Sequence, residues 1–168
     1  GDFHILRTDI LMDFGLSMNP NIDVGQIEGA FMQGVGMVTM EGIIWSDEQH
    51  KWLQSGSLFT QGPGTYKIPS FNDVPINFRV SLFKNASNPF AIFSSKGVGE
   101  PALTPSTTVF FSIKKAIESY RHDNGLTKYF ALNSPATCEK IRMGCADNFT
   151  KDVVGEETYE NFQPNGSY

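Results

Sequence analysis

The spacing of apolar and polar positions along the chain predicts strands near its beginning and middle. Residues 5–14 mix β-branched, apolar and charged side chains, and residues 77–84 alternate apolar with polar ones. Such alternation is typical of a strand with one buried face. A third, continuous apolar run at residues 91–93 indicates a buried strand before a glycine-rich turn. We expect a mixed sheet with packed helices, an α+β fold.

A long helix is expected over residues 24–40. Its apolar side chains recur at helical spacing and would face a core: Ile27, Ala30, Phe31, Val35 and Val38. Asp23 is the expected N-cap, with Gln26 three positions later as the partner of an approximate capping box.

Two further helices are expected downstream. Thr104-Pro105 is a start signal, with threonine as N-cap and proline at the first helical position, and this helix would end near residue 122, before Gly125. Ser134-Pro135 would cap a last helix over residues 136–149. We therefore expect residues 1–150 to form one domain or part of one, and residues 151–168 to be a loose tail.

The first helix carries glycines at positions 25, 29, 34 and 36. Each glycine costs about 1 kcal/mol relative to alanine in a helix interior, so packing must compensate. Gly25 and Gly29 share one face, where a neighbouring backbone or a flat cofactor could approach closely. The residues alone leave both alternatives open.

Composition excludes several classes of partner. The net charge is -5 and the pI near 5.1, which argues against a nucleic-acid partner, and no apolar run is long enough to span a membrane.

The cysteines and histidines do not form a recognisable site. Cys138 and Cys145 lie about two helical turns apart, too far for a disulfide, and are expected to be reduced thiols of a cytoplasmic protein. The three histidines are scattered, so we expect no metal held by side chains, and no dinucleotide fingerprint is present.

The most distinctive stretch is Ser-Ser-Lys-Gly-Val-Gly-Glu-Pro at residues 94–101. A strand, a glycine turn and a helix would place the Glu100 carboxylate near a helix N-terminus, where backbone N–H groups and the macrodipole favour its ionised form. The alternative is an ordinary surface turn with an acidic residue.

This stretch resembles the active-site loop of the molybdenum hydroxylases, the xanthine dehydrogenase and aldehyde oxidase family. Residues 19–34 resemble a second family segment in order and spacing, and shorter likenesses occur at residues 7–10, 62–69, 78–82 and 133–142. The resemblance implies a partial molybdenum-cofactor-binding domain, the C-terminal part of that portion of a much longer enzyme. Thr104-Pro105 departs from the apolar and small residues usual in the family.

The resemblance also implies roles for individual residues. Glu100 would be the general base, Val98 and Gly99 would offer backbone to a molybdenum–pterin cofactor, and Gln26 would form a hydrogen bond near the metal centre. Gln26 cannot fully serve both the cofactor and the capping box. The 2Fe–2S clusters and FAD of the full-length family would not bind this segment.

The implied activity is that of an oxidoreductase that hydroxylates aldehydes or N-heterocycles with oxygen from water. Gly97 and residues 133–135 look closer to aldehyde oxidases, whereas Glu100-Pro101 looks equally like xanthine dehydrogenases. The expected partners are the small-molecule substrate, the remainder of the large chain and, in the full-length family, a second copy in a homodimer. The segment alone is expected to be inactive. The alternative is a truncated, non-catalytic structural or interaction chain derived from such an enzyme.

Overall fold

The computed structural model describes residues 1–160 and 162–164, so part of the expected tail, residues 161 and 165–168, lies outside the described residues. The chain divides into two compact units. The first contains Gly1–Phe3, Gly36–Ile68 and the described residues from Val109 onward. The second contains His4–Val35 and Pro69–Thr108, and it holds both named strands.

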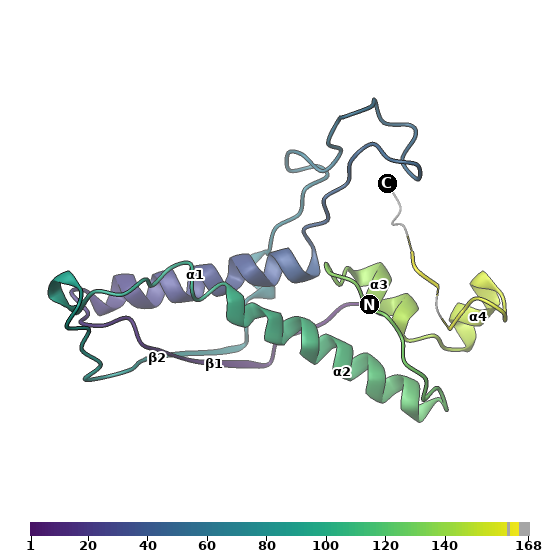
Figure 1. Ribbon diagram of the computed structural model, residues 1–168. Helices are drawn as coiled ribbons and strands as arrows, with labels where there is room; N and C mark the ends of the chain where they lie inside the picture. The colour runs from purple at the N-terminus through teal and green to yellow at the C-terminus, as the bar shows by residue number, and fades with distance from the viewer. Residues whose placement is uncertain (161, 165–168) are drawn as a thin grey trace. The chain divides into compact units, whose positions relative to one another are not determined.

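The second unit is built from two parallel strands and a long helix (Figure 1). Strand β1 (Arg7–Met12) pairs with β2 (Asn77–Leu82), with Arg7 opposite Asn77 and Met12 opposite Leu82. Helix α1 (Pro20–Thr39) lies along this pair, and its turns up to Val35 belong to this unit. One core joins helix, strands and the glycine-rich loop: Ile27, Ala30 and Ala102, packed against Ile10, Met12, Val80, Leu82, Val98 and Leu103.

The α+β class is confirmed, and both strands lie within their expected ranges. The named strands are parallel, however, and antiparallel pairing occurs among the described residues as isolated bridges, Gly15 with Ser95 and Trp45 with Leu58. The expected strand at residues 91–93 is wrong. A 3-10 helix, η2 (Ile92–Ser94), takes its place, because turn hydrogen bonds close there, such as Ser94 N to Ala91 O at 3.1 Å.

The start of α1 differs from the expected capping box. Asn19 is the cap, and its Oδ1 accepts hydrogen bonds from Asn21 N at 3.2 Å and Ile22 N at 3.5 Å. Pro20 follows as the first helical residue, where its missing N–H costs nothing. Asp23 instead lies inside the first turn and accepts from Ser17 Oγ. The helix therefore begins four residues earlier than predicted, and the capping role of Gln26 is excluded.

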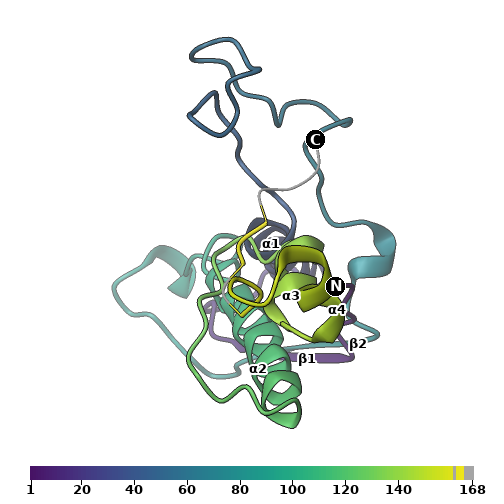
Figure 2. The ribbon, with the colours of Figure 1, turned by 90° about the vertical axis from the view of Figure 1, so that its right-hand side faces the viewer.

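The first unit contains the remaining helices, α2 (Thr107–Asp123), α3 (Cys138–Gly144) and α4 (Asn148–Val154). Figure 2 shows α3 and α4 next to each other, and Arg121 of α2 donates to the carbonyl of Gly144 at the end of α3. The short 3-10 helix η3 (Thr104–Ser106) precedes α2, and Leu103 is its N-cap, so helical conformation begins one residue earlier than the expected start with Thr104 as the cap. Gly125, at φ 78°, ends α2 through bonds from Gly125 N to His122 O and Leu126 N to Arg121 O, which form a Schellman motif.

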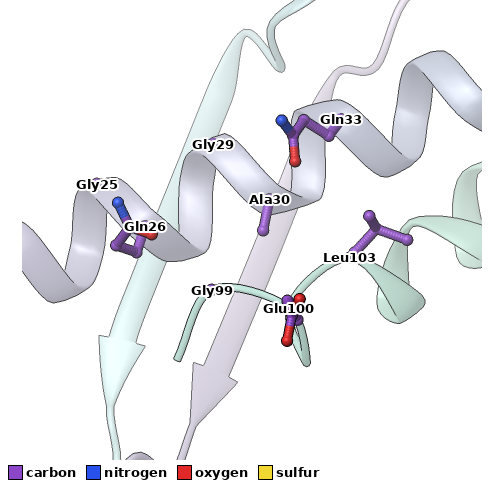
Figure 3. Close-up of a pocket in the computed structure, with 8 residues that line it drawn as sticks. All are labelled: Gly25, Gln26, Gly29, Ala30, Gln33, Gly99, Glu100 and Leu103. Carbon is purple, nitrogen blue, oxygen red and sulfur yellow. The ribbon is translucent and has the colours of Figure 1, made fainter. Parts of the chain in front are cut away.

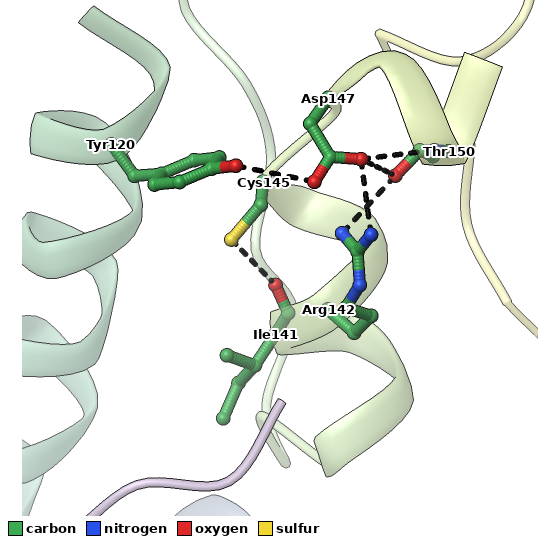
Figure 4. Close-up of polar contacts among 6 residues, drawn as sticks. All are labelled: Tyr120, Ile141, Arg142, Cys145, Asp147 and Thr150. Carbon is green, nitrogen blue, oxygen red and sulfur yellow. Dashed lines mark hydrogen bonds and ion pairs between the residues drawn. The ribbon is translucent and has the colours of Figure 1, made fainter. Parts of the chain in front are cut away.

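The single helix expected over residues 136–149 is wrong, because two short helices stand there. Ala146 adopts φ 52°, which interrupts the helical path, and Asp147 caps α4 by accepting from Thr150 N at 2.9 Å. Arg142 also donates to Asp147, at 3.0 Å, and Tyr120 of α2 reaches the same carboxylate at 3.2 Å (Figure 4). Although burial opposes ionisation of Asp147, the hydrogen bonds from Thr150 and Arg142 outweigh it, so the pKa of Asp147 lies well below its usual value.

A buried arginine joins the helices of this unit. Arg121 is only 1% exposed, its Nη1 donates to Gly144 O at 2.9 Å, and its guanidinium lies 4.7 Å from the centroid of the Phe130 ring. Both cysteines are free thiols, as expected. Among the described residues, no helix combines the length and the apolar character that crossing a membrane requires.

Candidate functional site

A pocket of about 290 Å³ lies between α1 and the glycine-rich loop within the second unit (Figure 3). We call it the α1 pocket. Its lining comes from one face of α1 and from the loop before η3: Gly25, Gln26, Gly29, Ala30 and Gln33, with Gly99, Glu100 and Leu103. Three of the four predicted site residues, Gln26, Gly99 and Glu100, therefore meet at one pocket.

The glycines of α1 divide between the two uses that the sequence left open. A Cβ added at Gly25 or Gly29 would meet no atom within 4 Å, so these positions leave an open floor in the pocket. A Cβ at Gly34 would stand 2.1 Å from Ser106 Oγ and 2.5 Å from Leu103 O. Gly34 thus allows close packing of α1 on the loop, whereas Gly25 and Gly29 leave space for a ligand.

Gln26 lies against the backbone of Gly99. A Cβ on Gly99 would stand 3.1 Å from Gln26 Oε1, so a side chain at position 99 would crowd the carboxamide in its present place. The side chain of Gln26 is exposed at the pocket and takes no part in a cap. The Gln26 carboxamide and the Gly99 backbone are therefore close neighbours at the pocket.

Glu100 is exposed in the turn that follows Gly99. Its carbonyl oxygen accepts from Leu103 N at 3.0 Å, which closes a turn before η3. Helical conformation begins at Thr104 in η3, and α2 begins at Thr107, so Glu100 precedes the first helical residue by one turn of the chain. Glu100 lines the pocket from this turn, and the segment that follows packs against α1 through Leu103 and Ser106.

The start of the glycine-rich loop is anchored beside the end of β1. Lys96 Nζ donates to Asp13 Oδ2 at 2.6 Å, and Lys96 N donates to Phe14 O at 3.2 Å. The hydrogen bond from Lys96, and then the one from Gly15 N, hold the pKa of Asp13 below its usual value. Gly15 has φ 85°, and a Cβ there would stand 1.7 Å from Ser94 O, so only glycine fits. These contacts fix where the loop starts.

Val98 is the predicted site residue whose side chain does not line the pocket. It is half-buried and packs against the core formed by Ile27, Ala30 and Ala102. Sequence reasoning also missed Gln33 and Leu103 as lining residues. Gln33 could have been found, because it follows Gln26 by seven positions, and residues so spaced lie on the same helix face.

Comparison with known proteins assigns this arrangement to a family. Residues 1–75 match the model of the molybdopterin cofactor-binding domain. The chain is 55% identical over 161 residues to xanthine dehydrogenase 1 of Arabidopsis thaliana, a match over 96% of this chain and 12% of that protein. It is also 55% identical over 151 residues to xanthine dehydrogenase/oxidase of Gallus gallus, over 90% of this chain and 11% of that protein. The chain belongs to the molybdenum hydroxylase family. The resemblance found in the sequence and the molybdenum–pterin cofactor class are thereby confirmed.

Solved structures of the family share the fold. Quinoline 2-oxidoreductase from Pseudomonas putida 86 aligns with a TM-score of 0.65 and 26% identity, over 82% of this chain and 16% of that one. The carbon monoxide dehydrogenase of Oligotropha carboxidovorans aligns with a TM-score of 0.61 at 19% identity, which supports the fold alone. The chain spans about an eighth or less of the curated relatives' length, since the matches cover 10–12% of them.

Proposed function

We propose that this segment forms one side of the molybdenum–pterin pocket of a xanthine dehydrogenase-type oxidoreductase, with Glu100 as the general base. The observation that carries the proposal is that Glu100 and Gln26 share one pocket with a glycine floor. The 55% identity to named xanthine dehydrogenases supports the reaction class. The remainder of the large chain would supply the other walls, the full-length protein would be a homodimer, and its location would be cytoplasmic.

The residues of the α1 pocket fit a flat, polar cofactor. Gly25 and Gly29 leave room beside the backbone of α1, and the carboxamide of Gln26 can both donate and accept a hydrogen bond. The backbone of Val98 and Gly99 would approach the group from the loop. When bound, the molybdenum–pterin group would supply the redox chemistry, while the protein supplies position and a base.

The role proposed for Glu100 is proton transfer. An ionised carboxylate at the pocket would take a proton from the water-derived oxygen nucleophile as it attacks an electron-poor carbon of the substrate. A positioned base of this kind typically contributes about 10²–10⁴-fold to the rate. The exposure of Glu100 at the open side of the pocket leaves the carboxylate accessible to a substrate.

The substrate class that the relatives favour is an electron-poor N-heterocycle, because the similar proteins named above are xanthine dehydrogenases. The aldehyde-oxidase-like specificity expected from Gly97 and residues 133–135 is the second candidate. Xanthine and an aromatic aldehyde, offered separately to the purified full-length enzyme, would distinguish the two by kcat/KM.

The test of the proposal is Glu100→Gln in the full-length enzyme that carries this segment. The amide keeps the size of the side chain but cannot act as the base, so kcat should fall by about 10²–10⁴-fold while molybdenum and pterin contents stay at the wild-type level. Glu28→Gln is the matched control, because Glu28 lies on α1 outside the pocket lining. A Glu100→Gln enzyme with full cofactor content and the wild-type rate would refute the role of Glu100.

A further inference from the structure

Gln33 presents a second carboxamide to the α1 pocket, to which neither the family resemblance nor the comparisons assign a role. Gln26 and Gln33 lie seven positions apart on one face of α1, about 10 Å along the helix axis at roughly 1.5 Å per residue. Gly29 and Ala30 lie between them. Figure 3 shows the Gln33 amide extending along α1 toward Gly29. The pocket thus has an amide at each end and a nearly bare helix surface between them.

The surroundings of Gln33 leave its amide available to a ligand. Its side chain is exposed at the pocket, and no hydrogen bond to it is present among residues 1–160 and 162–164. Downstream of Gln33, Gly34 packs against Leu103 and Ser106, which closes this end of the pocket. The carboxamide therefore lies where α1 and the glycine-rich loop converge.

A carboxamide has the chemistry to recognise one class of group. It offers an N–H donor and a carbonyl acceptor side by side, which match the adjacent C=O and N–H of a cyclic amide. A flat ring lying over Gly29 would present its edge to Gln33 at one end and to Gln26 at the other. The pterin carries such an edge, and so does an N-heterocyclic substrate with a ring C=O beside an N–H, such as xanthine.

We propose that Gln33 is a positioning residue of the α1 pocket, which holds the cyclic-amide edge of a planar ring opposite Gln26. This inference rests on the proposed function of the pocket. It adds a residue, and a ligand chemistry, that the family resemblance did not supply.

The experiment uses Gln33→Met and Gln33→Ala in the full-length enzyme. Methionine keeps the length of the side chain without the amide, and both replacements are good helix formers, so α1 should remain intact. Loss of one hydrogen bond should change binding by about tenfold. If the ring is the pterin, pterin and molybdenum contents per protein fall. If the ring belongs to the substrate, the cofactor content stays full and KM rises about tenfold. Glu28→Ala, outside the pocket on the same helix, should change neither quantity.

Gln33→Glu separates the amide chemistry from a purely structural role. Glutamate keeps the size and helix propensity of glutamine, but its carboxylate accepts hydrogen bonds and cannot donate one to the ring C=O. Cofactor content or KM should therefore change as in Gln33→Met, whereas a purely structural role predicts wild-type values for Gln33→Glu. Unchanged cofactor content and KM in all three Gln33 variants would overturn the inference. The proposed function is tested separately, because a wild-type rate in the Glu100→Gln enzyme would refute it whatever the Gln33 variants show.

Discussion

Gln26 of α1 lies beside the backbone of Gly99, and a methyl group added at position 99 would stand 3.1 Å from Gln26 Oε1. The two residues belong to elements far apart in the sequence, α1 and the loop that carries Glu100. The contact sets the carboxamide next to the backbone that precedes the candidate base. A side chain at position 99 would therefore move the Gln26 carboxamide from its place beside this backbone.

Replacing Gln26 should affect the cofactor more than the fold. Gln26→Ala in the full-length enzyme removes a pocket amide but no cap, because Asn19 caps α1. We expect molybdenum and pterin contents, or kcat, to fall about tenfold with little change in melting temperature. Asn19→Ala is the counterpart. It should cost about 1 kcal/mol of stability and leave a cofactor-loaded enzyme at its normal rate. If Gln26→Ala lowered the melting temperature but left the cofactor content and kcat normal, the assignment of Gln26 to the pocket would be contradicted.

Two glycines of the same helix should respond to alanine with opposite effects on stability. Gly34→Ala would force its methyl group onto Ser106 Oγ and Leu103 O, so the loop carrying Glu100 must move and the protein should lose stability. Gly29→Ala meets no atom within 4 Å and should stabilise α1 by up to about 1 kcal/mol, while reducing cofactor content because the methyl group fills the pocket floor. Hydrogen exchange of α1 and assay of bound pterin measure both effects. Equal protection in the two variants would count against the packing described.

The cap of α4 should be lost in acid. The pKa of Asp147 is lowered in the folded protein, so its stabilisation is complete above the ordinary carboxyl pKa near 4 and disappears as the pH falls through the lowered value. We expect protection of the α4 amides from hydrogen exchange to decline below about pH 4. Asp147→Asn can still cap the helix but cannot titrate, so this decline should be weaker. Asp147→Ala should cost about 1–2 kcal/mol at neutral pH. If protection of the α4 amides declines equally in Asp147→Asn, another titrating group must cause the loss.

The 168-residue segment on its own should associate in solution. Three large apolar side chains before the glycine-rich loop are exposed, Phe90 at 98%, Ile92 at 81% and Phe93 at 76%. Such exposure favours association through apolar contacts. Size-exclusion chromatography with light scattering should show oligomers, which Phe90→Ser combined with Ile92→Ser reduces. Lys84→Ser is the control at an exposed charged position. A monodisperse monomer from the unaltered segment would contradict this expectation.

The sequence by itself determined the elements with strong periodicity. Strands β1 and β2 and the buried face of α1 were predicted because apolar side chains recur there at intervals that only one backbone geometry can bury. The end of α2 at Gly125 was predicted because few residues other than glycine adopt its positive φ. Likewise, the motif around Glu100 carried the family resemblance, which the comparison with xanthine dehydrogenases confirmed.

Only the tertiary structure decided which of several suitable residues caps a helix and whether an apolar run forms a strand. Asn19 and Asp23 are both suitable caps, and in the structure Asn19 caps α1 while the Asp23 carboxylate accepts from Ser17. The run at residues 91–93 became a 3-10 turn because an apolar run forms a strand only where a neighbouring strand can pair with it. The α1 pocket could not be predicted from the spacing of apolar residues either. Its two sides lie some seventy residues apart in the chain. The loop packs on α1 through Ala102 and Leu103 in the core and through Ser106 against Gly34, and this packing brings Glu100 to the face that carries Gln26 and Gln33.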